Sequence, residues 1–260
     1  MVPAVRLRQV VLITPHLRAV TDRLETELGL APGFRDEGVG VFGLENRVLA
    51  AGDCFIEVLT PLTNDSAGHR YLERHGAGGY MAIFQFRQRD DRLRRVAELG
   101  IRIVWQADLP DIAGAHLDPR DVPGAIVSLD WAEPPWSWHW AGPQWRADSP
   151  TAPAPPFVSP GGLTSLTVAV ADPPAAAARW ADVLGDGVVL DAASIALADA
   201  GQAIAFVDSA ELGREGIVRC GLALSLGDER PATFSTEIGG VRFALSPPSR
   251  SPRSVSHDDE

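Results

Sequence analysis

The chain has 260 residues, which is long enough for two average domains, and its 45% hydrophobic content is that of an ordinary globular protein. With 23 basic and 34 acidic residues its formal net charge is −11, which disfavours nucleic acid and anionic membranes as partners. We expect a cytoplasmic protein, because no signal-peptide pattern and no membrane-spanning apolar stretch is present. We further expect a small-molecule ligand and a monomer or homodimer.

Three segments repeat one pattern, an apolar strand followed by a short amphipathic helix that ends at Leu-Gly. They begin at Gln9, Met81 and Ser165, and each reaches its Gly after nearly the same interval. The helices are predicted from apolar residues at helical spacing, which are Leu17, Val20, Leu24 and Leu28 in the first repeat, Leu93, Val96 and Leu99 in the second, and Ala176, Trp180 and Leu184 in the third. A Gly just after each helix suits a left-handed C-cap.

Extended runs follow each helix and make each repeat a βαβββ module. The predicted strands are 39–44, 47–52 and 54–61 in the first repeat, 102–105, 114–117 and 125–131 in the second, and 188–191, 194–200 and 203–208 in the third. A fourth repeat begins at 216–226, but too little chain follows for a helix before the strand 241–245. The fourth repeat should therefore be reduced.

Two modules make one domain, which predicts two domains in tandem. We expect the first domain over 1–145, a Pro-rich linker over 146–161, the second domain over 162–247, and a disordered tail over 248–260.

Consecutive motifs within residues 7–131 resemble the methylmalonyl-CoA epimerase family. IEVLTPLTND, HRYLERHGAGG and LDPRDVPGAIVSL follow the order of that family's Glu-Leu-Leu-x-Pro, Phe-Leu-x-x-x-Gly-x-Gly and Leu-His-Pro-Lys-Asp-x-x-Gly-x-x-x-Glu-Leu runs. The family belongs to the vicinal oxygen chelate, or glyoxalase-like, superfamily, which is built from paired βαβββ modules. Residues 162–247 resemble it only through the strand, helix and Leu-Gly pattern. The resemblance implies an α+β protein with tandem glyoxalase-like domains, the second of them reduced.

The resemblance also implies where a metal would bind, since the superfamily holds it on the first and last strands of each module, inside a cup. These positions fall on Gln9, Glu57, Met81 and Ser128, where the epimerases typically have His, Gln, His and Glu. A catalytic divalent ion needs about three good protein donors, and a thioether and a neutral hydroxyl are poor ones. We therefore expect no cofactor and no strong metal site, with at most weak binding of a divalent ion at Gln9 and Glu57.

Two residues are candidate catalytic groups. Glu57 is either a structural carboxylate bonded to Gln9 or a general base with a pKa raised by its apolar strand. His116 either points into the cup as an acid-base group or lies on its rim. The family's own carboxylate base would fall near Gly40 or Val41, and neither can take a proton.

The remaining candidates are ligand-binding residues of the first-domain cup, namely Gln9, Val11, Phe55, Met81, Ile83, Gln85 and Ser128. Five tryptophans fall within 131–145, where they either cover a domain face or line a wall for a planar ligand.

Three functions stay open. The favoured one is binding of a small apolar or aromatic molecule without a strong metal site, because three of the four aligned positions differ from the epimerase pattern. The alternative is an isomerase or lyase that moves a proton on a small carbonyl or acyl substrate with Glu57 or His116. The third is a structural or interaction module, which the fold alone does not exclude.

Overall fold

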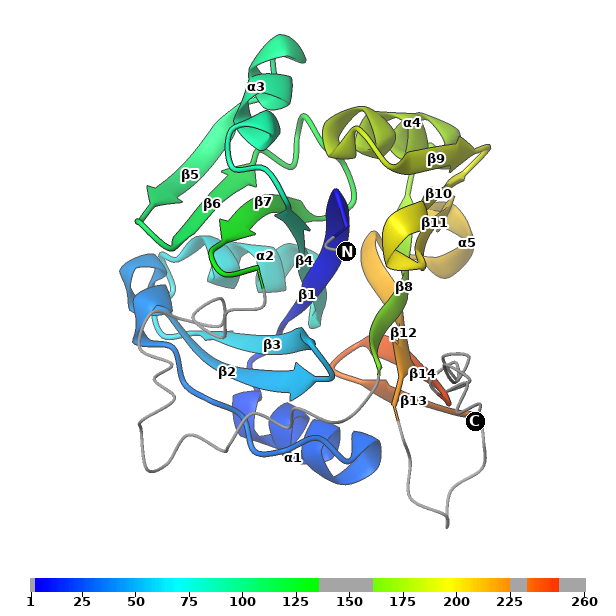
Figure 1. Cartoon of the computed structure of the whole chain (residues 1–260). Helices are drawn as coiled ribbons and strands as arrows, with labels where there is room; N and C mark the ends of the chain where they lie inside the picture. Colours follow the sequence, from blue (N-terminus) through cyan, green and yellow to red (C-terminus); the bar gives the residue numbers. More distant parts are fainter. Residues whose placement is uncertain (1–2, 136–160, 225–232, 248–260) are drawn as a thin grey trace, which may run out of the picture.

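The computed structural model describes residues 3–135, 161–224 and 233–247 of the chain. These residues form a mixed α+β protein in which 14 strands belong to one curved, branched sheet, with helices at its ends (Figure 1). The predicted α+β class and the repeated strand-helix-strand modules are confirmed. The tryptophans from Trp136 to Trp145, most of the expected linker and the expected tail lie outside the described residues.

The first half of the sheet carries the first two modules. Its elements are β1 (Val5–Ile13), α1 (Leu17–Leu28), η1 (Glu37–Phe42), β2 (Leu44–Ala51), β3 (Cys54–Pro61), α2 (Ala67–His75), β4 (Gly78–Phe86), α3 (Asp91–Glu98), β5 (Ile103–Asp108), β6 (Ile112–Leu117) and β7 (Ile126–Ala132). The strand order is β2-β3-β1-β4-β7-β6-β5. The β1/β3 and β4/β7 pairs are parallel, and the central β1/β4 pair that joins the two modules is antiparallel.

The second half repeats this plan. Its elements are β8 (Gly162–Val170), α4 (Pro173–Leu184), β9 (Val188–Asp191), β10 (Ser194–Leu197), η3 (Ala198–Ala200), β11 (Gln202–Asp208), α5 (Ser209–Leu212), β12 (Gly216–Ala223), β13 (Phe234–Ile238) and β14 (Val241–Ser246). The β8/β11 and β12/β14 pairs are parallel and β8/β12 is antiparallel, as in the first half. Among the described residues after β12 there is no helix, which agrees with the expected reduction, but strand β13 was not predicted.

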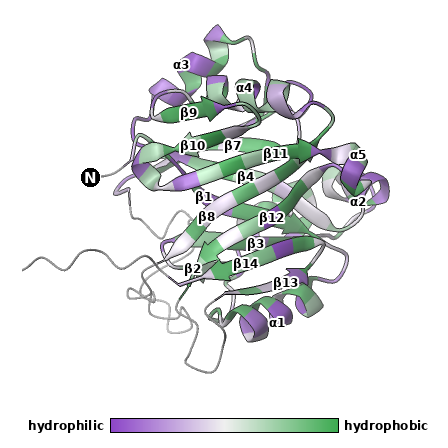
Figure 2. Cartoon of the chain, turned by 90° about the vertical axis from the view of Figure 1, so that its right-hand side faces the viewer, coloured by the Kyte–Doolittle hydropathy of each residue, from purple (hydrophilic) through white to green (hydrophobic). Residues whose placement is uncertain are grey.

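The predicted helices are observed as α1, α3 and α4. Helix α1 buries Val20, Leu24 and Leu28 on one face, and it ends at Gly29, whose φ of 68° is the left-handed conformation that Gly adopts without strain. Helix α4 begins at Pro173 and is capped by the Asp172 carboxylate, which accepts a hydrogen bond from the Ala175 amide. The buried core is made of apolar side chains. In Figure 2 hydrophobic residues run along much of the strands, and hydrophilic residues are prominent in helices α1 and α3. No described helix is long and apolar enough to cross a membrane.

The prediction of a strand over 39–44 was wrong. Most of this run lies in the 3-10 helix η1, which starts at a cap formed by the Asp36 carboxylate accepting from the Gly38 amide at 2.9 Å. The run contains two glycines, which have no side chain to pack on a pleated sheet, and it ends at Gly43 with a φ of 67°. Before η1, Phe34 forms an isolated antiparallel bridge with Val48 of β2.

The two halves share one hydrophobic core. Strands β4 and β12 meet at Gly79 and Ile217, and Trp180 of α4 packs edge-on against Phe84 of β4 with 5.9 Å between ring centroids. The side chain of Gln202 bonds to both the amide and the carbonyl of Leu7. The first-half cup is therefore built on a floor that the second half supports.

Candidate ligand-binding cup

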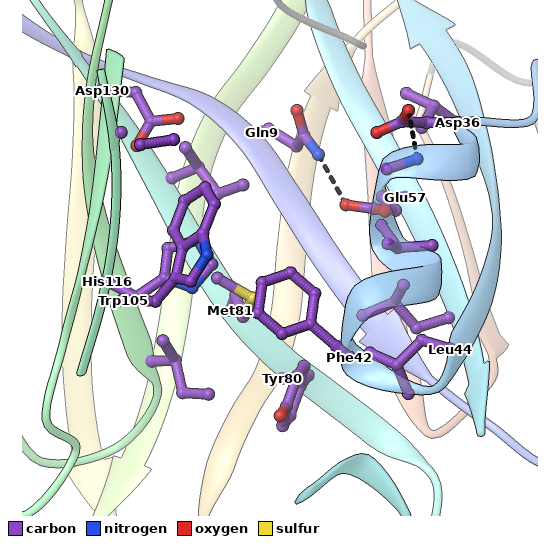
Figure 3. A pocket seen from close by; sticks show the side chains of 18 of the residues that line it. Gln9, Asp36, Phe42, Leu44, Glu57, Tyr80, Met81, Trp105, His116 and Asp130 are labelled. Atoms are coloured by element: carbon purple, nitrogen blue, oxygen red, sulfur yellow. Dashed lines mark hydrogen bonds between the residues drawn. The ribbon is translucent and has the colours of Figure 1, made fainter. Parts of the chain in front are cut away.

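The first half encloses a cavity of about 340 Å³ inside the curve of its sheet. Strands β1, β3 and β4 form its floor, β5 to β7 form one wall, and η1 with β2 forms the opposite wall (Figure 3). The lining is mostly apolar, with Val39, Leu44, Leu59, Met81, Ile83 and Ile126 among its members. Because successive side chains of a strand point to opposite faces, the inward set alternates along each strand, as at Met81 and Ile83.

A hydrogen-bond network fixes the orientation of the Glu57 carboxylate on the η1 side of the cavity. The Glu57 carboxylate accepts from the Gln9 amide at 2.7 Å (Figure 3). It also accepts from the Asn46 amide at 2.6 Å. Asn46 in turn accepts from the backbone amide of Asp36 at 2.9 Å, which places a second carboxylate beside the first. Glu57 is therefore oriented by two neutral donors and has an acidic neighbour.

These surroundings make Glu57 a weak acid. Burial raises the pKa of Glu57 to about 7, and the nearby Asp36 carboxylate adds to that rise. The hydrogen bonds from Asn46 and Gln9 act in the other direction, because they favour the ionised form. Near neutral pH both the protonated and the ionised form of Glu57 are therefore populated.

Asp130 is a third carboxyl group of the cavity, on the wall opposite Glu57 (Figure 3). It follows Ser128 by two residues on β7, and the Ser128 hydroxyl donates to it. Burial raises the pKa of Asp130 to about 7. Gly114 on the paired strand β6 leaves room for the carboxylate, since a methyl group there would lie 3.1 Å from the carboxylate oxygen.

Three rings form an aromatic wall that joins the β5–β6 side of the cavity to η1. Trp105 and His116 are cross-strand partners on β5 and β6 with centroids 4.4 Å apart, and Phe42 of η1 meets Trp105 edge-on at 5.6 Å. Burial lowers the pKa of His116 to about 4, so the imidazole is neutral at physiological pH. Neither of its nitrogens has a hydrogen-bond partner in the part of the chain that the structure describes.

The structure brings five of the sequence-predicted residues together around the cavity, namely Gln9, Glu57, Met81, Ile83 and His116. The other four do not line it. Val11 and Phe55 are fully buried in the same apolar cluster as the lining residues Met81 and Ile83. Ser128 is buried and donates to the Ala115 carbonyl as well as to Asp130.

Gln85 lies further along β4 and takes part in a separate network. It accepts from the guanidinium groups of Arg6 and Arg8 and donates to the Pro135 carbonyl. This glutamine therefore fixes two buried or half-buried arginines at the end of the sheet and does not face the cavity.

Sequence reasoning missed Asp36, Trp105 and Asp130 as lining residues. A signal for Asp130 was available, because it shares a strand face with the aligned position Ser128. The signal for Asp36 was its place as a helix cap, which the predicted strand over 39–44 concealed.

The four aligned positions do not fit a first-row divalent ion as a donor set. The amide of Gln9 and the carboxylate of Glu57 bond to each other, Met81 offers only a thioether, and the Ser128 hydroxyl already donates to Asp130. In the described residues no three side chains of the His, Cys, Asp and Glu types are grouped so as to hold a metal.

No protein-family model and no curated protein matches this chain. Among solved structures, methylmalonyl-CoA epimerase from Streptomyces coelicolor, in complex with 2-nitronate-propionyl-CoA, is 18% identical over 49% of this chain and 96% of its own, with a TM-score of 0.44. The Mycobacterium tuberculosis epimerase is 19% identical over 48% of this chain and 87% of its own, with a TM-score of 0.44.

A hypothetical protein from Staphylococcus aureus matches nearly the whole chain. It is 10% identical over 94% of this chain and 99% of its own, with a TM-score of 0.65, which shows a shared fold and nothing of activity. The chain therefore shares its fold over almost its whole length with the Staphylococcus aureus protein.

Proposed function

We propose that the first-half cup binds a small, mainly apolar or aromatic molecule and does so without a strong metal site. The observation that carries this proposal is the cavity of about 340 Å³, with its apolar floor, its wall of Phe42, Trp105 and His116, and a few polar groups. Small-molecule sites have this character, with cavities of roughly 300–1,000 Å³ and a small number of placed polar groups.

The energetic support comes from the apolar surface that the cavity exposes. Burying apolar area is worth about 25 cal/mol per Å², and offset or edge-on ring contacts add roughly 0.5–1.5 kcal/mol each. A planar ligand that packs against the exposed faces of Phe42 and Trp105 gains both terms. The aligned metal positions should add little to the binding energy, because the Gln9 amide already donates a hydrogen bond to the Glu57 carboxylate.

The test is binding of the neutral fluorophore N-phenyl-1-naphthylamine, followed by its emission and by the melting temperature. We expect saturable binding to the full chain and its loss in Ile83→Trp, because the indole would fill the cavity. The matched control is Val189→Trp, which adds the same ring at an exposed site on β9 (57% exposed). Unchanged binding by a folded Ile83→Trp variant would contradict the proposal.

A second candidate, proton transfer on a small carbonyl or acyl substrate, is favoured by one observation. Glu57 lines the cavity with a pKa of about 7, which suits a general acid-base group at neutral pH. Deuterium exchange at carbon next to a carbonyl, followed by NMR over a panel of small ketones and thioesters, tests it. Exchange that is catalysed by the wild type and lost in Glu57→Gln supports this candidate, and exchange at the buffer rate contradicts it.

A further inference from the structure

The charges around the cavity have a single sign. Asp36, Glu57 and Asp130 line it, and no Lys or Arg is present among the described lining residues. Within the described part of the chain, none of the three carboxylates takes part in an ion pair within 4.0 Å. Their hydrogen-bond donors are neutral, namely the amides of Gln9, Asn46 and Gly38 and the hydroxyl of Ser128.

Buried carboxylates without an ion-pair partner are costly, because removal from water disfavours the ionised form. The Arg92 guanidinium, which does not line the cavity, offsets this cost at Asp130 only in part. The cavity offers space next to two of them, on opposite walls (Figure 3). A positively charged group in that space would recover Coulomb energy in a setting where solvent screens it weakly. An anionic group would meet repulsion from both sides.

The aromatic wall provides independent support. His116 is a largely buried, neutral imidazole that lines the cavity, and it lacks a hydrogen-bond partner among the described residues. Its unprotonated nitrogen can accept a hydrogen bond from an N–H donor. The faces of Trp105 and Phe42 beside it attract cations through the ring quadrupole.

We propose that the occupant of the cup is a lipophilic organic cation, a protonated amine carried on an aromatic or apolar body. Its ammonium group lies between the carboxylates of Glu57 and Asp130 and within reach of His116, and its body packs against Phe42, Trp105 and Met81. This inference rests on the proposed function of the cup and adds the charge of the ligand.

A matched set of probes with one aromatic body tests the inference, namely 2-(2-naphthyl)ethylamine, 2-(2-naphthyl)ethanol and 2-naphthylacetate. Their affinities for the full chain are measured by isothermal titration calorimetry at low salt. We expect the amine to bind at least about 10-fold more tightly than the alcohol, and the acetate to bind more weakly than the alcohol. Equal or tighter binding of the alcohol overturns the cation inference and leaves the proposed function standing, whereas binding of none of the three overturns both.

Two variants locate the effect. Asp130→Asn keeps the size of the side chain and should lower the affinity for the amine about 10-fold while leaving the alcohol unchanged. Asp199→Asn, which removes one exposed carboxylate in η3 of the second half, should alter neither affinity. The melting temperature of each variant shows whether it is folded. An amine affinity that is unchanged in folded Asp130→Asn, or lowered equally by Asp199→Asn, overturns the placement of the ammonium group.

Discussion

Replacing Asp130 by Asn should stabilise the protein at alkaline pH and not at acidic pH. Burial holds the pKa of this carboxyl at about 7, against an ordinary value of 3.8, so folding raises it by about three units. One unit corresponds to about 1.4 kcal/mol, which gives an upper bound of roughly 4 kcal/mol. Because the folded pKa is the higher one, the wild type loses this stability as the pH rises from about 4 through about 7.

The substitution removes that pH-dependent loss. The carbonyl oxygen of the introduced amide can still accept from the Ser128 hydroxyl. The amide has the size of the carboxylate, so it fits the space that Gly114 leaves beside it. Urea denaturation of both proteins at pH 4 and pH 8 measures the difference between their free energies of unfolding. We expect the variant to gain about 1–4 kcal/mol over the wild type on going from pH 4 to pH 8. A difference that does not change between the two pH values would refute the reasoning that burial keeps this carboxyl protonated.

Three further changes test other parts of the structure. Burial lowers the pKa of His116 to about 4, so the wild type should lose up to roughly 3 kcal/mol of stability as the pH falls from 6.5 to about 4. His116→Gln should not show this loss. Urea denaturation midpoints that fall equally with pH in both proteins would contradict this. Gln202→Leu should cost about 2–4 kcal/mol in urea denaturation, because it leaves Leu7 and Leu163 without three buried hydrogen bonds; a loss below about 1 kcal/mol would be inconsistent with their importance. Met81→His should raise Co²⁺ affinity at least about 10-fold over Met81→Leu, read from visible absorption, and equal affinities would show that the aligned positions do not converge.

The repeated architecture was predictable because periodicity is a local property. The helical spacing from Leu17 to Leu28 and the Gly that follows it suffice to place α1, and the same holds for α4 after Pro173. The strands of the third repeat were recognised from short apolar runs in the same order. Because the modules repeat along the chain, the sequence alone predicted that consecutive modules would pair, and no contact between residues had to be known.

The candidate site was only partly predictable, because it depends on which strands lie opposite one another. Gln9 and Glu57 were identified from a resemblance, and their mutual hydrogen bond follows from the parallel β1/β3 register. Asp130 was overlooked because the aligned position was Ser128, and a two-residue offset on one face decides which side chain reaches the cavity. Trp105 lines the cavity beside its cross-strand partner His116, and no local sequence pattern specifies that pairing.

The hydrogen bonds between Gln202 and Leu7 also bear on how the protein is made. The first residues paired between β1 and β3 are Gln9 and Phe55, so Leu7 extends beyond this ladder, and a glutamine 195 residues later satisfies its amide and carbonyl. At synthesis rates of about 5–20 residues per second, roughly 10–40 s pass between the appearance of Leu7 and that of Gln202. Throughout that interval the end of β1 at Leu7 lacks this partner, and an unpaired strand end can pair with other chains. Translation speed and the supply of chaperones should therefore affect the soluble yield of this protein more than that of a chain in which each domain completes its own sheet.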